Sequence, residues 1–422
     1  MKFDLKNIGP IKEASIKVDG LTVIAGENSI GKSAIGKAIF CLMKGTSEVF
    51  IDINLDRRVL YQQTISEIEK SLPKGEIYEN IISELQISKL YYSKKNIEET
   101  YIFNHHIDLA KEYVIQLLDN IDKPERILEL INHLETINMV GDNDLEKKLS
   151  TTFDVLIRDV FNGSINNKKD YQNFGSIKLS KDKTISYYRI NNDKTIQSIA
   201  HRSNYLKDVI LIESPLILSL YRFIRDSLAF NRNGDFNSSY QGLPYHTFDF
   251  VKKISEKHYA YNHTINKEIS EIISGNLDFD NNQDDFIFVD SNNEKHDIVN
   301  VASGIKSFGI LQLLATSENL NEDNILIIDE PEVHLHPFWQ VEYAKILVKL
   351  AENNIPVVVA SHSPYFIEAL KTYSDKTIKD KTNFYLGEMQ EGGSVFKDVT
   401  DDLEPIFELL AIPMQQLMLD NH

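Results

Sequence analysis

The chain has 422 residues with a net charge of −18, and 42% of its residues are hydrophobic and 26% charged. Its length predicts two or three structural lobes, and its acidity argues against a general basic surface for nucleic acid, although 45 lysines and arginines leave room for a local basic groove. The sequence has no membrane-length apolar run and no signal-peptide pattern. Its one cysteine, Cys41, cannot form an intramolecular disulfide. We therefore expect a cytoplasmic protein without a membrane contact.

The N-terminal residues predict strands and a helix around a glycine-rich loop. Residues 11–18 partly alternate, Asp19-Gly20 is a turn pair, and residues 21–25 are a short apolar run. Residues 33–43 carry an apolar stripe at helical spacing. The loop therefore follows a strand and opens a helix.

The loop reads G-E-N-S-I-G-K-S and fits the pattern G-x-x-x-x-G-K-[ST] of a phosphate-binding loop. Its glycines allow a tight curl whose N–H groups face phosphates, and the positive end of the following helix faces the same anion. Lys32 is placed to reach the β- and γ-phosphates, and the Ser33 hydroxyl to bind Mg²⁺. The predicted nucleotide-binding residues are Gly26, Glu27, Asn28, Ser29, Ile30, Gly31, Lys32, Ser33 and Ala34.

The segment from about residue 46 to 207 is polar and rich in Lys, Glu, Asn and Ile. It contains helical patterns near 60–72, 76–90 and 107–140, and an alternating pattern near 175–196 that predicts a hairpin turning at residues 180–183. We interpret 46–207 as an insertion, mainly helical with a β hairpin, in a core domain that begins with residues 1–45. A long coiled coil is not expected, because no heptad run is sustained.

Residues 208–300 predict a return to the core, followed by a helical subdomain. Residues 208–213 have the pattern of a buried strand, which Ser214-Pro215 ends. The next predicted elements are a helix at 216–228, a loop at 231–239, a helix at 247–273 and a hairpin formed by 286–289 and 297–299.

Residues 301–422 complete the predicted core. A turn and helix cover 301–320, apolar strands cover 324–330 and 355–360 on either side of a helix at 338–351, and closing strands cover 384–386 and 395–399. Near-continuous apolar strands that alternate with helices indicate a parallel sheet covered on both faces.

Polar residues at the ends of these strands are candidates for chemistry. Asp329 and Glu330 end one strand, where the first carboxylate can hold Mg²⁺ and the second can orient or deprotonate a water molecule. His362 follows the next strand and can bond a γ-phosphate. Ser303 and Gly304 start a helix and can offer N–H groups to an anion, although an ordinary helix cap explains them equally well.

The order of these motifs resembles the ABC-type ATPases, particularly the branch of the SMC, Rad50 and RecF proteins. The segments "LIIDEPEVHLHP" and "VVVASHSP" look more specifically like the overcoming-lysogenization-defect ATPases of bacterial anti-phage systems. The resemblance covers about 1–45 and 285–400. It implies an α/β fold, a P-loop ABC-type ATPase head with a mixed central sheet, into which a mainly helical lobe with a small β hairpin is inserted.

The resemblance also implies roles for matching residues. Lys32 and Ser33 match the Walker A residues, Asp329 and Glu330 the Walker B aspartate and the catalytic glutamate, and His362 the switch histidine. Ser303 and Gly304 match the signature, which contacts the γ-phosphate bound by an opposite subunit. ATP and Mg²⁺ are thus the implied ligands, in a homodimer or a higher oligomer, and a lone chain should hydrolyse ATP slowly.

Two features depart from the family pattern. The signature reads S-G-I-K-S. The strand at 208–213 has Glu213-Ser214 at its end, where the family has a glutamine close to the metal. We expect Glu213 or Ser214 to take that place near Mg²⁺, with Gln62-Gln63 as the competing candidate. Glu332, His334 and His336 have the spacing of metal ligands, but the family places them in its D-loop.

Three functions are compatible with these motifs. The first is an ATPase of anti-phage defence that acts as sensor, scaffold or regulator of a separate effector, a nuclease or toxin. We expect the effector to be separate because roughly 60 residues follow His362, too few for a nuclease domain of about 100 residues. The second is a RecF-like repair ATPase that binds DNA directly, and the third is a non-hydrolysing module locked by ATP. The acidic charge favours the first over the second, since it disfavours strong DNA binding by this chain alone, and Glu330 argues against the third.

Overall fold

The structure, a computed structural model, describes residues 1–72, 74–91, 97–116, 124–137, 145–167, 174–181, 184–200, 208–229, 243–255, 263–317 and 319–420. The loop predicted at 231–239 and the hairpin turn at 182–183 lie outside these residues. The chain forms two compact units. The first comprises Met1–Ser47 and Leu149–His422, and the second comprises Glu48–Lys148.

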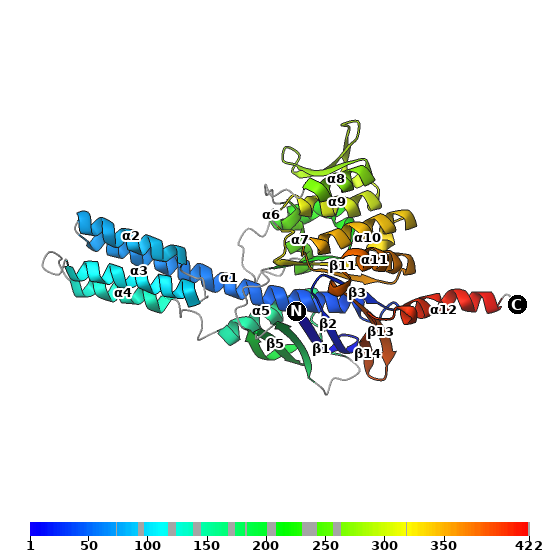
Figure 1. The fold of residues 1–422 in the computed structure, drawn as a ribbon, viewed down its shortest axis with the longest axis horizontal. Coiled ribbons are helices and arrows are strands. Elements are labelled where there is room, and N and C mark those ends of the chain that lie inside the picture. Colours follow the sequence, from blue (N-terminus) through cyan, green and yellow to red (C-terminus); the bar gives the residue numbers. More distant parts are fainter. Residues whose placement is uncertain are drawn as a thin grey trace. The chain divides into compact units, whose positions relative to one another are not determined.

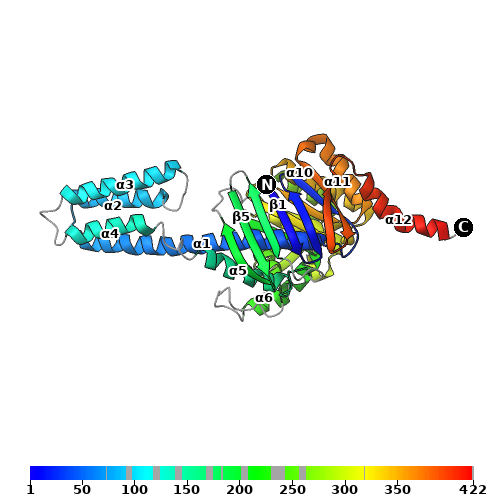
Figure 2. The same cartoon turned by 90° about the horizontal axis from the view of Figure 1, so that it is seen from below.

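An 11-stranded mixed sheet organises the first unit, in the order β6-β5-β4-β1-β2-β14-β13-β3-β12-β11-β7 (Figures 1 and 2). Its strands are β1 (Lys2–Ile8), β2 (Ile11–Lys17), β3 (Leu21–Ala25), β4 (Gly175–Lys181), β5 (Thr184–Asn191), β6 (Lys194–Ala200), β7 (Asp208–Ile212), β11 (Asn324–Asp329), β12 (Val357–Ser361), β13 (Thr382–Gln390) and β14 (Gly393–Asp398).

The parallel part of the sheet, β13-β3-β12-β11-β7, sets the position of the strand ends. Strands β3 and β12 are buried along their whole length, as their continuous apolar sequences predict. Ser361 pairs with Ala25, and Ala360 pairs with Asp329. The carboxyl ends of β3, β12 and β11 therefore lie at one level, at one edge of the sheet.

The antiparallel part of the sheet includes residues that the sequence assigned to an insertion. Strand β4 pairs with β1, and β5 and β6 extend the sheet beyond it (Figure 2). The helix α5 (Leu145–Val160) adds apolar contacts, since the Phe153 ring stacks on Tyr188 at 4.0 Å. The chain thus divides at residues 47/48 and 148/149 rather than at 45/46 and 207/208, because backbone pairing and this apolar face make α5, β4, β5 and β6 part of the first unit.

Helix α1 (Lys32–Ser71) begins at the phosphate-binding loop and joins two segments that the sequence predicted as separate helices. Gly36 lets α1 approach the sheet closely, since a Cβ there would lie 3.0 Å from the Ile327 side chain. The other helical elements of the first unit are η2 (Pro215–Leu220), α6 (Tyr221–Ala229), α7 (Tyr245–Ser255), α8 (His263–Ile273), η3 (Ile298–Asn300), α9 (Ser303–Ala315), η4 (Pro331–His334), α10 (Pro337–Glu352), α11 (Pro364–Thr377), η5 (Lys379–Lys381) and α12 (Glu404–Asp420).

A second, three-stranded sheet has the order β10-β9-β8. It contains β8 (Gly275–Asp280), β9 (Asp285–Asp290) and β10 (Lys295–Asp297). The predicted hairpin is present as β9 and β10, whereas residues 298–300 form the turn η3 because the Asp297 side chain accepts the Val299 N–H and caps it. Helix α9 packs chiefly against α7, α8, β8, η2 and η4.

The second unit is helical, as the sequence predicts. It contains the end of α1, α2 (Glu76–Tyr91), α3 (Ile97–Gln116) and α4 (Pro124–Ile137), and α3 lies beside both α2 and α4 (Figure 1). The pattern predicted at 107–140 is divided between α3 and α4. Tyr61, Leu85 and Ile107 are among the fully buried side chains of its core. Within the residues described, no helix has both the length and the apolar character for crossing a membrane.

A buried ionic network ties α1, β7 and α7 together in the first unit. Lys44 contacts Asp208 at 2.9 Å and Asp249 at 2.7 Å, and Lys253 contacts the same carboxylates at 2.7 and 2.8 Å. Lys253 also donates to the Val209 carbonyl at 2.8 Å. Burial raises the pKa of Asp208, but the two lysines outweigh it and leave that pKa below its usual value.

Replacing Lys253 should strongly destabilise the first unit. The substitution Lys253→Met removes one of the two cations and leaves buried carboxylates short of a partner, so the free energy of unfolding should fall by about 3 kcal/mol or more. Lys371→Met removes the exposed ion pair with Asp375 on α11 and should change the free energy of unfolding by about 0.5 kcal/mol or less. Denaturant unfolding measures both values, and equal losses would contradict the structural role of the network.

Candidate active site

The phosphate-binding loop adopts a backbone that its glycines make possible. Gly26 has φ of +150° and Gly31 has φ of +103°. A Cβ on Gly31 would lie 2.8 Å from the Pro10 ring, so the position also lacks space for a larger residue. Helix α1 begins at Lys32, which places the positive end of the helix at the loop. This geometry is suited to binding phosphates.

Lys32 connects the loop to the end of β11. Only 3% of its side-chain surface is exposed, and its Nζ donates to the carbonyls of Gly26 at 3.0 Å and Glu27 at 2.9 Å. The same nitrogen lies 3.6 Å from Glu330 Oε1. The structure thus brings together two predicted site residues that are almost three hundred positions apart in the sequence.

Glu330 has the left-handed backbone conformation, with φ of 46° and ψ of 53°, which is uncommon outside glycine and asparagine. Its N–H donates to the Ala360 carbonyl at 2.9 Å, which fixes the residue against β12. Its Oε1 lies 3.4 Å from His362 Nδ1, on the next strand end. Glu330 therefore stands between the loop lysine and the predicted switch histidine.

Asp329 is half-buried and lies beside Ser33. Burial raises the pKa of the Asp329 carboxyl, a hydrogen bond from Ser33 opposes this shift, and the nearby charges of Glu330 and Glu213 raise the pKa further. Its Oδ1 is buried without a hydrogen-bond partner in the described part of the chain. A buried, unpartnered carboxylate oxygen is unfavourable unless something compensates it. Mg²⁺ prefers oxygen ligands, so Ser33 and Asp329 fit this metal.

Glu213 lies just beyond β7, and both of its carboxylate oxygens are engaged. Lys37 Nζ lies 2.8 Å from Oε1, and His246 Nε2 lies 2.6 Å from Oε2. Burial raises the pKa of Glu213, but hydrogen bonds and charges from His246 and Lys37 outweigh it and lower the pKa to about 2. The carboxylate is close enough to act on Asp329 electrostatically, while its place as a metal residue remains a prediction.

Ser214, the other candidate beyond β7, caps η2 and lies 3.4 Å from His334 Nε2 through its Oγ. Gln62 and Gln63, the competing candidates, are exposed on the part of α1 that belongs to the second unit. The loop and the strand ends are elements of the first unit, and a role for these two glutamines stays a prediction.

The three residues with metal-ligand spacing in the sequence, Glu332, His334 and His336, contact different parts of the structure. His336 caps α10 by accepting the Phe338 N–H at 3.3 Å, and His334 lies next to Ser214. Glu332 is buried and accepts hydrogen bonds from Ser361 Oγ at 2.7 Å and the His362 N–H at 2.8 Å. The spacing suggested a metal role for Glu332 and the family resemblance a D-loop role, but neither predicted its contacts with Ser361 and His362.

Ser303 and Gly304 are the first residues of α9. A Cβ on Gly304 would lie 2.7 Å from the Trp339 ring and 3.3 Å from the His334 carbonyl, so this end of α9 packs closely against η4 and α10. Lys306 extends from the same turn to Ser219 Oγ at 2.7 Å. The predicted signature thus packs beside the segment that follows Glu330.

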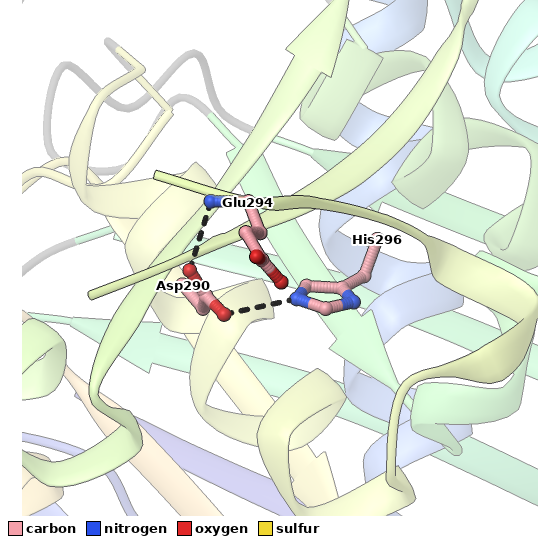
Figure 3. A group of neighbouring side chains, drawn as sticks. All are labelled: Asp290, Glu294 and His296. Carbon is pink, nitrogen blue, oxygen red and sulfur yellow. Dashed lines mark hydrogen bonds and ion pairs between the residues drawn. The ribbon is translucent and has the colours of Figure 1, made fainter. Parts of the chain in front are cut away.

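One further group of side chains has ligand-type atoms close together, and it lies on the small sheet. Asp290, Glu294 and His296 face one another there (Figure 3). Asp290 accepts the N–H groups of Asn292 and Glu294, both at 2.9 Å, and pairs with His296 at 3.1 Å. These bonds close the turn between β9 and β10, and they account for the group without a ligand.

The fold and the strand-end site define a P-loop ATPase with a mixed central sheet. The chain belongs to the AAA ATPase domain family, which it matches over residues 1–367, and it is an ATPase. The predicted fold class is thereby confirmed, whereas membership of the lysogenization-defect branch stays a prediction. A comparison with curated proteins found no match.

The chain is also similar to solved head domains of SMC proteins. An SMC head bound to the C-winged helix domain of ScpA is 12% identical, with a TM-score of 0.41 over 96% of this chain and 98% of that chain. The SMC head domain from Thermotoga maritima is 13% identical, with a TM-score of 0.37 over 94% and 98%. A head domain with an extended coiled coil from Pyrococcus furiosus is 12% identical, with a TM-score of 0.41 over 98% of both chains.

Replacing Asp329 by asparagine should stabilise the protein in the absence of metal. Because the pKa of Asp329 is raised by folding, its ionisation lowers stability as the pH rises above about 3.8, the ordinary value. Asp329→Asn should therefore unfold at a higher temperature at pH 7 in a chelator, and this advantage should shrink towards pH 3.8. The exposed Asp401→Asn is the control. A lower unfolding temperature for Asp329→Asn at pH 7 would contradict this account.

Proposed function

We propose that the chain hydrolyses ATP at the common edge of β3, β11 and β12. The observation that supports this most directly is the position of Glu330 Oε1, 3.6 Å from Lys32 Nζ and 3.4 Å from His362 Nδ1. A lysine on a phosphate-binding loop, a carboxylate and a histidine at one point provide charge stabilisation and a proton acceptor for transfer of a phosphoryl group to water.

Each residue has one part in the proposed reaction. The loop N–H groups and Lys32 bind the β- and γ-phosphates. Glu330 takes a proton from the attacking water while the water oxygen bonds to the γ-phosphorus. His362 contacts the γ-phosphate through Nε2, and the bond between the γ-phosphorus and the bridging oxygen of the β-phosphate breaks, which releases ADP and phosphate. Mg²⁺, held by Ser33 and Asp329, would neutralise charge on the phosphates when bound.

A second copy of the chain completes the site in this proposal. Ser303 and Gly304 would contact the γ-phosphate held by the loop of the other subunit, in a head-to-tail homodimer with two Mg-ATP. The exposure of Ala302 and the partial exposure of Ser303 support this role, as does the rigid packing of Gly304 against Trp339. Turnover by the isolated chain would then be slow, because each loop lacks its signature.

The wider role that we propose is control of a separate effector, a nuclease or toxin, in bacterial anti-phage defence. The support is the similarity of the segments around Asp329 and His362 to the lysogenization-defect ATPases. The second unit, a compact helical unit of its own, would provide a surface specific to the effector. Closing and opening of the ATP-bound dimer would be the signal that the effector receives.

A mixing experiment tests whether the site is shared between subunits. Lys32→Ala removes the phosphate lysine and Ser303→Arg blocks the signature, so each variant alone should lose nearly all ATP turnover. In a mixture, hybrid dimers hold one intact site, and turnover should recover to about a quarter of the wild-type rate. Size-exclusion chromatography of the mixture with ATP checks that the two variants form a hybrid dimer. No recovery from variants that do dimerise would exclude a shared site.

The effector is tested by co-purification from the native host. Glu330→Gln should bind ATP without hydrolysing it and so hold the closed dimer, and a nuclease or toxin should then co-purify with it in ATP and Mg²⁺. Lys32→Ala is the matched control that should retain none. Turnover that DNA stimulates, with a steep dependence on salt, would instead favour the RecF-like alternative.

A further inference from the structure

Glu332 is a buried carboxylate to which the proposed reaction assigns no role. Only 3% of its side-chain surface is exposed. Its Oε1 accepts the Ser361 hydroxyl at 2.7 Å and the His362 N–H at 2.8 Å, while its Oε2 is buried without a hydrogen-bond partner among the described residues. Burying a carboxylate in this way is costly, and an asparagine or glutamine would accept the same two hydrogen bonds at a lower cost. The charge itself therefore calls for an explanation.

The charge is directed at His362. Glu332 Oε1 lies 3.3 Å from His362 Nδ1, and Glu330 Oε1 lies 3.4 Å from the same nitrogen. Two carboxylates thus face one edge of the imidazole ring. Neither contact is a hydrogen bond, but the two negative charges occupy the Nδ1 side of the ring, so Nε2 is the nitrogen left for a substrate.

The backbone around His362 is held on both sides. Before it, Ser361 bonds Glu332; after it, the Ser363 hydroxyl donates to Gln340 Oε1 at 2.8 Å. Gln340 Nε2 in turn donates to the Glu332 carbonyl at 3.4 Å. These bonds close a ring through η4, the end of β12 and the start of α10. The position of the histidine therefore depends on Glu332 through both the main chain and the imidazole.

We propose that Glu332 is a positioning residue that holds the His362 ring beside Glu330 with Nε2 directed to the γ-phosphate. This inference rests on the proposed hydrolysis at the same site. Glu332 acts through His362 and does not touch the nucleotide. Its loss should therefore lower kcat while leaving the KM for ATP nearly unchanged, because the loop and Lys32 provide the binding.

A double-mutant cycle tests this dependence. We would measure kcat and KM for wild type, Glu332→Gln, His362→Ala and the double variant, with the exposed Glu352→Gln as the matched control. Glu332→Gln keeps the size and the acceptor oxygen but removes the charge, and should lower kcat about tenfold. The double variant should be no slower than His362→Ala. Additive losses would show that Glu332 acts independently of the histidine and would overturn the proposal.

Two further variants keep the outcome unambiguous. Thermal unfolding shows whether Glu332→Gln folds. If it does not, Ser361→Ala takes its place, because it removes one of the hydrogen bonds that hold the carboxylate. Ser361→Ala should lower kcat several-fold in a chain that has His362 and should have no effect on His362→Ala. An unchanged kcat in either folded variant would also overturn the proposal. Lys32→Ala is the reference for hydrolysis itself. If that variant keeps full turnover, the proposed function fails, whereas loss there with additive behaviour at Glu332 rejects only the positioning role.

Discussion

The parallel pairing of β3, β12 and β11 is the constraint on which the site depends. Ser361 is level with Ala25, and Asp329 is level with Ala360. A shift of one residue in either pairing would turn each side chain to the other face of the sheet. Because the three strands are almost wholly apolar and buried, burial holds this alignment without help from the polar residues at their ends. Glu330, His362 and the loop can therefore carry charges selected for chemistry rather than for folding.

The partly and fully buried carboxylates at this edge of the sheet lower its stability. The pKa of Asp329 is raised by burial, and one oxygen each of Asp329 and Glu332 is buried without a hydrogen-bond partner in the described structure. The opposite balance holds at the two ends of β7. Asp208 is compensated by Lys44 and Lys253, and Glu213 by Lys37 and His246. Carboxylate oxygens without a hydrogen-bond partner thus occur where Mg-ATP is proposed to bind, and carboxylates compensated by nearby cations occur where α1 and α7 pack on the sheet.

The sequence predicted the parallel core and its site because each strand there is a continuous apolar run that ends at a polar motif. The phosphate-binding loop, Asp329-Glu330 and His362 were all found from such local patterns, and the structure brings them to one edge. Strand β4 was placed in an insertion, because its partner β1 is more than 150 residues away and short polar strands do not specify their neighbours. The contacts of Glu332 with Ser361 and His362 could not be predicted either, because the spacing of Glu332, His334 and His336 resembles a metal motif and says nothing about burial.

We propose that the residues at this edge form one site for ATP hydrolysis, with Glu330 as the proton acceptor. The most direct measurement compares ATP affinity and single-turnover hydrolysis for wild type and Glu330→Gln at saturating Mg²⁺. A general base contributes about a hundredfold or more to the rate. We predict a loss of at least that size with an unchanged Kd for ATP, because Lys32 and the loop remain intact. Hydrolysis by Glu330→Gln at the wild-type rate, with ATP bound equally well, would contradict this account.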